Sequence, residues 1–231
     1  MAFLLQCWDM KKNIVIVSGG RLGNKAFFEA RASLLANRWL IACDGGARHL
    51  HALGLKPDVL IGDMDSLDAA YLADYERQGI EIVRHPVHKD FTDTALALDY
   101  ALGLHPEAID IWGALGGRID HALANIHLLI RGKEAGIPTR LVDEYAEVMI
   151  AGDEIRFVDA VGCLVSLIAL SPVVEDITID GFEYPLTHEC LTMAESRGIS
   201  NVITSATASI SVGSGNLLVV RYRQKDVFPE V

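Results

Sequence analysis

Closely spaced cysteines are missing from this chain of 231 residues. Its four cysteines are far apart and form no CxxC motif, so the sequence predicts neither a disulfide framework nor a cysteine-rich zinc site. The histidines offer no substitute, because His49 with His51, and His85 with His88, lack the i, i+4 spacing of a helical metal pair. A reducing, cytoplasmic compartment fits this composition, and zinc is not expected.

Long apolar stretches and basic charge are also scarce. The longest apolar run, Gly162 to Val174, is broken by serines and a proline and is shorter than the roughly 20 residues of a membrane helix. Lys and Arg number 20 against 31 Asp and Glu, and the formal charge of -11 opposes binding to nucleic acid or anionic lipid. We therefore expect no membrane and no nucleic-acid partner. An acidic protein that handles phosphate must use a metal ion.

Neither of the common phosphate-binding motifs occurs. There is no GxxxxGK[ST] and no GxGxxG in the sequence, so the chain is not predicted to be a P-loop phosphotransferase or a typical dinucleotide-binding protein. Any site for a nucleotide has to be built from other loops.

Short apolar runs that alternate with helical patterns fill the first part of the chain. Amphipathic spacing indicates helices at Lys25 to Asn37 and Ala47 to Leu53. This alternation is typical of a mostly parallel sheet with helical crossovers, whose ligands bind at the carboxyl ends of the strands. The strand-like runs are Asn13 to Val17, Trp39 to Cys43, Asp58 to Ile61, Ile80 to Val83 and Ala108 to Trp112.

The pattern changes near Tyr145, where strand-like runs follow one another closely and long helical periods end. Turn residues separate these runs, which favours a small antiparallel β-sandwich. We expect an N-terminal lead-in over residues 1–12 without the features of a secretory signal, an α/β domain over 13–146 and an all-β domain over 147–231. The runs are Cys163 to Leu170, Asp176 to Ile179, Val202 to Thr204, Ala208 to Val212 and Leu217 to Tyr222.

Four polar clusters follow the predicted strands of the first domain. Asp63 and Asp65 are two residues apart, so they can converge on one hard cation if the backbone turns sharply between them, while another loop supplies a third carboxylate. Mg²⁺ is the expected ion, because it would let these aspartates anchor ATP rather than repel it. The clusters are Asp44-Gly45-Gly46, Gly62 to Ser66, Lys89 to Asp93, and Gly113 to His121.

The last of these clusters has the composition of a phosphate site. Gly116 and Gly117 allow backbone amides to approach phosphate closely, and Arg118 offers a planar fork of donors. Asp120, His121 and Asn125 follow at the start of a predicted helix, whose N-terminal amides would add to the site.

Each cluster also has a purely structural interpretation. Asp-Gly-Gly is an ordinary turn, Ser66 could cap the predicted helix Leu67 to Tyr75, and Thr92 with Asp93 could cap Thr94 to Leu102. The pair Arg118 and Asp120 could be an exposed ion pair of little energetic weight. Four such turns at successive strand ends of one sheet nevertheless favour a common site.

In order and in sequence, these motifs resemble those of the thiamine pyrophosphokinase family. The first domain carries DGGA, GDMDS, KDFTD and GGRIDH followed by Asn125, and the second carries GFEYPL, GISN and VGSGNLLVV. The resemblance covers nearly the whole chain after the first dozen residues. It implies an N-terminal Rossmann-like domain with helices on both faces of its sheet, a C-terminal β-sandwich, and a homodimer whose active sites lie between the two kinds of domain from different subunits.

The resemblance also assigns roles to matching residues. Asp63, Asp65 and Asp93 would hold Mg²⁺, with Asp44 beside the metal and the phosphates. Together with Arg118, these four aspartates form the expected catalytic set. Thiamine would meet Asp44, Asn125, Ser200 and Asn201. ATP would meet Lys89, Asp90, Thr92, Gly116, Gly117, Arg118, Asp120 and His121.

One position departs from the family pattern. Ala95 stands where many members carry a glutamate, two residues after Asp93, so a carboxylate role at that position is not expected here.

The implied reaction is direct attack of the thiamine hydroxyl on the β-phosphorus of ATP, with AMP as the leaving group. Positioning and charge neutralisation would supply most of the catalysis. Two alternatives stay open at this point: a pyrophosphokinase of the same architecture acting on another alcohol such as a hydroxymethylpterin, and a thiamine or nucleotide sensor without turnover.

Overall fold

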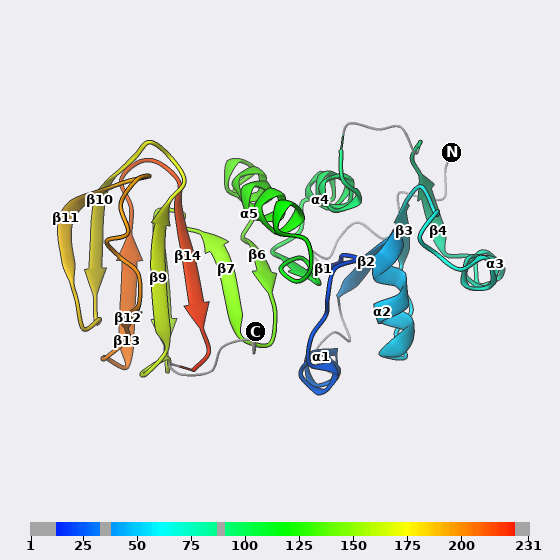
Figure 1. Ribbon diagram of the computed structural model, residues 1–231, viewed down its shortest axis with the longest axis horizontal. Coiled ribbons are helices and arrows are strands. Elements are labelled where there is room, and N and C mark those ends of the chain that lie inside the picture. Colours follow the sequence, from blue (N-terminus) through cyan, green and yellow to red (C-terminus); the bar gives the residue numbers. More distant parts are fainter. Residues whose placement is uncertain (1–12, 33–37, 87–90, 225–231) are drawn as a thin grey trace. The chain divides into compact units, whose positions relative to one another are not determined.

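The computed structural model of the chain describes residues 13–32, 38–86 and 91–224. It divides into two compact units, one ending at Glu144 and the other beginning at Tyr145. Figure 1 shows the elements of both units, and each unit is described separately below. Among the described residues, no helix is both long and apolar enough to cross a membrane.

A six-stranded parallel sheet forms the centre of the first unit, in the order β6-β5-β1-β2-β3-β4. The chain runs outward from β1 to β4 and then returns to the other side of β1 with β5, so the direction of winding changes beside β1. A change of this kind creates a crevice at the carboxyl ends of the strands. The strands are β1 (Ile14–Val17), β2 (Trp39–Cys43), β3 (Val59–Gly62), β4 (Glu81–Arg84), β5 (Ile109–Trp112) and β6 (Thr139–Val142).

Helices cover both faces of this sheet. Phe28, Leu50 and Tyr75, from α1, α2 and α3, pack in one buried cluster with Val15 and Val17 of β1. Because side chains alternate along a strand, Ile14 and Ile16 point to the other face, where α4 and α5 lie (Figure 1). The helices are α1 (Lys25–Ala32), α2 (Ala47–Ala52), α3 (Ala69–Arg77), α4 (Asp93–Gly103) and α5 (Ile119–Glu134), and a short 3₁₀ helix, η1 (Asp44–Gly46), precedes α2.

Two antiparallel sheets of four strands each make up the second unit, in the orders β12-β9-β14-β7 and β11-β10-β13-β8. Together with the parallel sheet of the first unit, they confirm the predicted fold class of an α/β domain followed by an all-β sandwich. The strands are β7 (Ala146–Ile150), β8 (Glu154–Val158), β9 (Leu164–Ala169), β10 (Val173–Asp180), β11 (Leu186–Thr192), β12 (Asn201–Val202), β13 (Thr207–Ser211) and β14 (Leu217–Tyr222).

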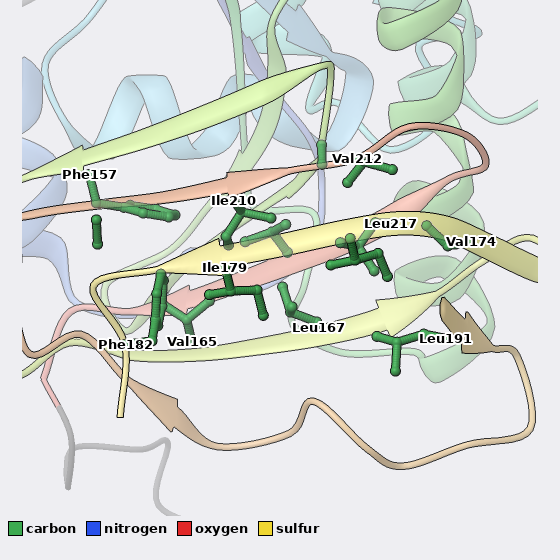
Figure 2. Packing of buried hydrophobic residues seen from close by; sticks show 14 of the residues in the cluster. Phe157, Val165, Leu167, Val174, Ile179, Phe182, Leu191, Ile210, Val212 and Leu217 are labelled. Atoms are coloured by element: carbon green, nitrogen blue, oxygen red, sulfur yellow. The ribbon is translucent and has the colours of Figure 1, made fainter. Parts of the chain in front are cut away.

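The core of the sandwich is drawn from the inner faces of both sheets (Figure 2). Val165 and Leu217 from one sheet lie in the same buried cluster as Ile179 and Ile210 from the other, all at 1% exposure or less. Burying a side chain of this size contributes roughly 1.5–3 kcal/mol. The alternation of apolar and polar residues along β13 places Ala208 and Ile210 in this core.

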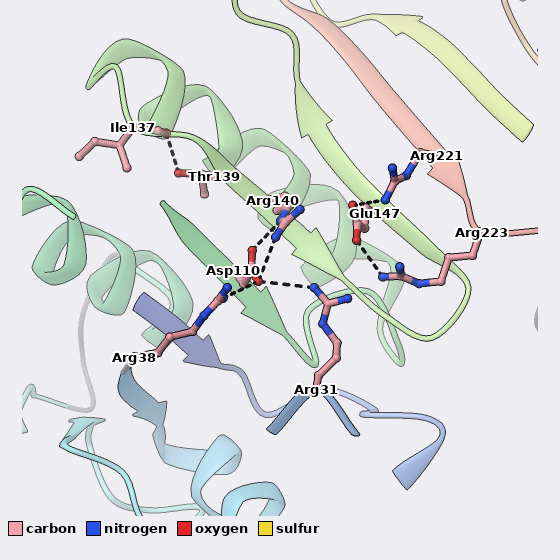
Figure 3. Close-up of polar contacts among 9 residues, drawn as sticks. All are labelled: Arg31, Arg38, Asp110, Ile137, Thr139, Arg140, Glu147, Arg221 and Arg223. Carbon is pink, nitrogen blue, oxygen red and sulfur yellow. Dashed lines mark hydrogen bonds and ion pairs between the residues drawn. The ribbon is translucent and has the colours of Figure 1, made fainter. Parts of the chain in front are cut away.

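Each unit also buries one carboxylate against several arginines (Figure 3). In the first unit, Asp110 of β5 is 2% exposed, and its carboxylate lies 2.6 Å from Arg140 Nε, 3.1 Å from Arg38 Nη1 and 3.7 Å from Arg31 Nη2. Arg140 reaches it because β5 and β6 place the two residues opposite each other. These contacts join α1, the start of β2 and β6 to the amino-terminal half of β5.

The carboxylate of Glu147 plays the corresponding part in the second unit. It accepts hydrogen bonds from Arg221 Nη2 at 2.8 Å and Arg223 Nη2 at 2.9 Å. Both arginines lie at the end of the segment that pairs β14 with β7. The ion pairs therefore tie β7 to its neighbour β14.

Candidate active site

A pocket of about 600 Å³ lies in the first unit, at the carboxyl ends of its strands. Loops after β1, β2, β3 and β5 meet there with the first turn of α4 and the start of α5. This is the crevice predicted from the change of winding direction beside β1. The lining residues include Ser18, Gly19, Gly20, Arg21, Cys43, Gly45, Arg48, Ser66, Thr92, Asp93, Thr94, Gly113, Ala114, Gly116, Gly117, Arg118, His121 and Asn125.

Glycines let the loops after β1 and β5 meet closely. The N–H of Gly20 donates to the carbonyl of Gly113 at 3.0 Å. A Cβ atom on Gly20 would lie 2.4 Å from that same oxygen, and Gly113 itself has φ of +66°. Only glycine fits both positions, and the result is a pocket wall made of backbone.

Three carboxylates gather beside this pocket. Oxygen atoms of Asp44, Asp63 and Asp65 all lie within 4.8 Å of one another. Met64 makes the convergence of the last two possible, because its φ of +67° turns the backbone sharply between them. The cluster meets the pocket at Ser66, which lines the pocket and donates its N–H to Asp44 Oδ2 at 2.9 Å.

The environment of Asp44 suits a cation. Asp44 is 1% exposed, and its Oδ1 has no hydrogen-bond partner within the part of the chain that the structure describes. Burial is the largest cause that raises its pKa, with the charges of Asp93, Asp63 and Asp65 acting in the same direction and the hydrogen bond from Ser66 opposing them. A buried oxygen without a donor, facing other carboxylates, fits a divalent ion with oxygen ligands.

Asp93, the third predicted metal ligand, lies next to this cluster rather than within the group of three. A Cβ on Gly62 would meet Asp44 Cβ at 2.8 Å and Asp93 Oδ1 at 3.4 Å, so Gly62 lies against both aspartates, and the charge of Asp93 helps to raise the pKa of Asp44. Asp93 is the first residue of α4 and lines the pocket. Asp93 therefore reaches the pocket from the segment that the sequence indicated, while Asp44 is the residue that lies in one group with Asp63 and Asp65.

The start of α4 is fixed by hydroxyl groups. Thr92 is the N-cap, and its Oγ1 accepts a hydrogen bond from the N–H of Ala95 at 3.2 Å. The buried hydroxyl of Thr94 lies 2.7 Å from that of Ser18, which follows β1. Thr92 therefore caps α4 and also lines the pocket. Ala95, where many family members carry a glutamate, is buried.

Ser66 is not the cap of the next helix, as one interpretation of the sequence suggested. Helix α3 begins at Ala69, and Asp68 caps it by accepting from the N–H of Ala70 at 2.8 Å. Ser66 instead donates its hydroxyl to Asp65 Oδ1 at 3.0 Å, because the GDMDS turn keeps it beside the carboxylates.

Arg118 and Asp120 form an ion pair at the mouth of the pocket. Arg118 Nε donates to Asp120 Oδ1 at 3.1 Å, and this bonding lowers the pKa of Asp120 to about 2. Both side chains are exposed, so the pair can reorganise around a ligand at little cost. Gly117, at φ of +103° with open space around it, leads into α5.

Two predicted pocket residues at α5 differ in exposure. Asn125 is buried, and its Nδ2 donates to the carbonyl of Ala114 at 2.9 Å. It therefore holds the loop after β5 and lines the pocket as well. His121, one turn earlier on α5, is exposed and also lines the pocket.

In the second unit, Asn201 holds the loop that carries GFEYPL. Its Oδ1 accepts from the N–H groups of Tyr184 and Val202 at 3.0 and 2.9 Å, and its Nδ2 donates to the Tyr184 carbonyl at 2.7 Å. Ser200 adopts a φ of +63°, and the Ser166 hydroxyl receives its N–H at 3.1 Å. The two motifs that were linked by resemblance are thus physically joined, and Tyr184 is left 64% exposed.

Lys89 and Asp90 lie outside the described residues and stay predictions. Sequence reasoning missed several pocket residues, among them Ser18, Arg21, Arg48 and Thr94. The Ser-Gly-Gly turn after the first strand was the available signal, because it has the same position and composition as the Asp-Gly-Gly turn after the second.

Comparison with known proteins places both units in one family. Residues 31–141 match the family model "Thiamin pyrophosphokinase, catalytic domain", and residues 154–217 match "Thiamin pyrophosphokinase, vitamin B1 binding domain". A protein of Bacillus subtilis (strain 168) named thiamine pyrophosphokinase is 34% identical over 188 residues, covering 78% of this chain and 86% of the relative.

Solved structures give the same result. The crystal structure of thiamine pyrophosphokinase from Bacillus subtilis aligns with a TM-score of 0.82 at 30% identity, covering 94% of this chain and 100% of that one. The enzyme from Geobacillus thermodenitrificans aligns at 0.80 and 28% identity with the same coverage. That from Candida albicans, at 0.77 and 16% identity, covers 92% of this chain and 89% of its own and shows the shared fold. The chain belongs to the thiamine pyrophosphokinase family.

Proposed function

We propose that the protein is a Mg²⁺-dependent enzyme that transfers the pyrophosphoryl group of ATP to the hydroxyl of thiamine, giving thiamine diphosphate and AMP. The observation that carries this proposal is the group of Asp44, Asp63 and Asp65 beside a pocket walled by glycine backbone and arginine. In a chain of net charge -11, that group becomes attractive to a polyphosphate only with a cation. The aspartate group, the glycine wall of the pocket and the family membership together support the proposal.

In the proposed assignment, Asp63, Asp65 and Asp93 hold Mg²⁺, and Asp44 turns its unpartnered oxygen toward the same ion. The bound ion would neutralise phosphate charge and polarise the bond that breaks. Asp44 stays in place through its hydrogen bond with Ser66. The cluster thereby fixes where the phosphate chain lies relative to the sheet edge.

Residues around the pocket would orient ATP. Gly116 and Gly117 expose backbone close to the phosphates, and Arg118 leaves Asp120 or reorients with it to bind phosphate oxygens. His121 and Thr92 complete this wall, and we propose that Lys89 and Asp90 also line the ATP site.

The reaction needs one bond formed and one broken. The thiamine oxygen bonds to the β-phosphorus, the bond from that phosphorus to the oxygen bridging it to the α-phosphorus breaks, and AMP departs with the bridging oxygen. An aspartate of the cluster takes the hydroxyl proton. No covalent intermediate with the protein is required, so positioning and electrostatics carry the catalysis.

For thiamine, we propose Asp44 and Asn125 in the first unit and Ser200 and Asn201 in the second. Asn201 acts by holding the Tyr184 loop, and Ser200 offers its hydroxyl from a strained turn. We further propose that the 13–146 domain binds ATP, that the 147–231 domain binds thiamine and forms a cytoplasmic homodimer, and that each site combines domains of different subunits.

A comparison of alcohols tests the proposal. Purified protein with ATP and Mg²⁺ should release AMP with thiamine, and not with a hydroxymethylpterin, because the GISN and GFEYPL segments favour thiamine. Release of AMP with the pterin but not with thiamine would identify the protein as a pyrophosphokinase acting on a hydroxymethylpterin. Binding of both ATP and thiamine without any AMP would make the protein a sensor. Sedimentation equilibrium measures the dimer separately.

A further inference from the structure

Part of the pocket wall after β1, the pair Gly19 and Gly20, has no side chains of its own to hold it. Glycine loses more backbone freedom on ordering than any other residue. A loop of this kind forms a fixed surface only if other groups bind its peptide units. Its contacts therefore show what makes the wall rigid.

Two consecutive residues of α2 supply those contacts from one side. Arg48 Nη2 donates to the carbonyl of Gly19 at 2.7 Å, and His49 Nε2 lies 2.6 Å from the carbonyl of Gly20. A carbonyl oxygen can only accept, so Nε2 of His49 carries the proton. Burial is the main cause that lowers the pKa of His49, which keeps the ring neutral in this tautomer.

The loop after β5 holds the same peptide units from the other side. Gly20 N–H donates to Gly113 at 3.0 Å, and Arg21 N–H donates to Gly116 at 3.4 Å. Gly19 also contacts Gly45 so closely that a Cβ on Gly19 would lie 3.1 Å from the Gly45 Cα. Carbonyls and amides of the wall are thus bound by different elements.

We propose that Arg48 and His49 are positioning residues for the reaction, which clamp the Gly19–Gly20 wall in the shape that binds the phosphates of ATP. The inference rests on the proposed function and adds to it a pair of residues from a helix that carries no other predicted role. His49 does not line the pocket and acts through Gly20. Arg48 lines the pocket and acts through Gly19.

The test measures binding of α,β-methylene-ATP, which resists cleavage, in the presence of Mg²⁺. His49→Leu and Arg48→Leu should each weaken binding about tenfold, the equivalent of one hydrogen bond of about 1.4 kcal/mol. In steady-state assays, KM for ATP should rise by a similar factor while KM for thiamine stays within about twofold, because only the nucleotide wall is released.

Conservative variants separate positioning from general stability. The amide nitrogen of His49→Gln can replace Nε2, so this variant should regain most of the affinity, as should Arg48→Lys. His51→Leu is the matched control on the same helix, since His51 packs beside Tyr71 with ring centroids 4.4 Å apart and lies outside the pocket lining. The His51→Leu variant should bind the analogue as the wild type does.

The outcomes divide cleanly. Unchanged affinity in both leucine variants, or equal losses for ATP and thiamine that the conservative variants do not restore, would overturn the inference and leave the proposed function standing. A wild-type protein that binds no analogue would overturn both. If His49→Leu does not fold, as its melting curve would show, Arg48→Leu against Arg48→Lys decides the question.

Discussion

Replacing Asp44 by asparagine should separate two effects of the carboxylate cluster, its cost to folding stability and its contribution to Mg²⁺ binding. The side chain is buried and its pKa is raised, first by burial and then by the charges of neighbouring aspartates. A raised pKa means that the unfolded chain ionises first, so the free energy of unfolding falls as pH rises from the ordinary pKa of 3.8 to the raised one. Above the raised pKa and without Mg²⁺, the full loss is present, and the Asp44→Asn variant should escape it.

The magnitude follows from the geometry of the cluster. Two unit charges 4.8 Å apart repel by about 3.5 kcal/mol at an effective dielectric constant of about 20, and by less where Asp65 meets solvent. An asparagine keeps the acceptor for Ser66 and removes the charge. We expect the metal-free variant to equal or exceed the wild type in stability by about 1–2 kcal/mol.

Mg²⁺ should reverse the order of stability. An ion present at 100 times its dissociation constant stabilises the folded wild type by about 2.7 kcal/mol, which corresponds to roughly 5–10 °C in melting temperature for a chain of this size. Asp44→Asn and Asp63→Asn should lose most of this shift and most of the turnover. Asp74→Asn, an exposed aspartate paired with Arg77 on α3, is the matched control and should keep both.

Thermal melts with and without Mg²⁺, followed for each unit by circular dichroism, provide the measurement. Equal Mg²⁺-induced shifts in the wild type and in Asp44→Asn would refute the reasoning, because the orphaned oxygen would then have no part in binding the ion. A metal-free Asp44→Asn that is clearly less stable than the wild type would refute the electrostatic argument.

Other substitutions probe the fold around the site. Gly20→Ala should raise KM for ATP about tenfold or more, since its Cβ would lie 2.4 Å from the Gly113 oxygen, whereas Gly79→Ala, at φ of +71° in open space, should cost only about 1 kcal/mol of stability. Asp110→Asn should lower the free energy of unfolding in urea by about 2 kcal/mol, because half-buried arginines lose their common anion; an unchanged midpoint would contradict this. Asn201→Ala should cost about 2–3 kcal/mol through three lost hydrogen bonds and raise KM for thiamine, and normal thiamine kinetics would separate Asn201 from that site.

Much of the first unit was predictable from local sequence. The five apolar runs are all strands. Buried parallel strands are continuous in apolar residues, and only β4, at the end of the sheet, lacks fully buried residues. The sixth strand, β6, was not predicted, since Thr139 and Arg140 interrupt its pattern and only pairing with β5 explains it. Asp110 in a buried strand gives no hint of its partners, which come from α1, from the residue before β2 and from β6.

The second unit was predicted by class and less well by element. Strands β7, β8 and β11 were missed: β11 contains His188, Glu189 and Cys190 and has an irregular register with β10. Its exposed face carries the polar residues, and cross-strand pairing rather than propensity fixes such strands. The turn geometry of Met64 and Ser200 was likewise beyond sequence reasoning, because left-handed backbone is rare outside glycine.

The site divides in the same way. Strand-end position predicted which loops meet, so Asp44, Thr92, Asp93 and the Gly116–Arg118 segment were found. The closest carboxylate grouping was not, because it depends on the left-handed turn at Met64 and on how near Asp44 lies to Asp63 and Asp65. Contacts made through carbonyls, such as those of Arg48 and His49, leave no mark in a motif.

The most direct measurement of the central claim is the mass of the products formed from ATP and thiamine. With Mg²⁺, the account predicts thiamine diphosphate and AMP in equal amounts, and with the metal chelated it predicts neither. Formation of ADP with thiamine monophosphate, or equal turnover without a divalent cation, would contradict it.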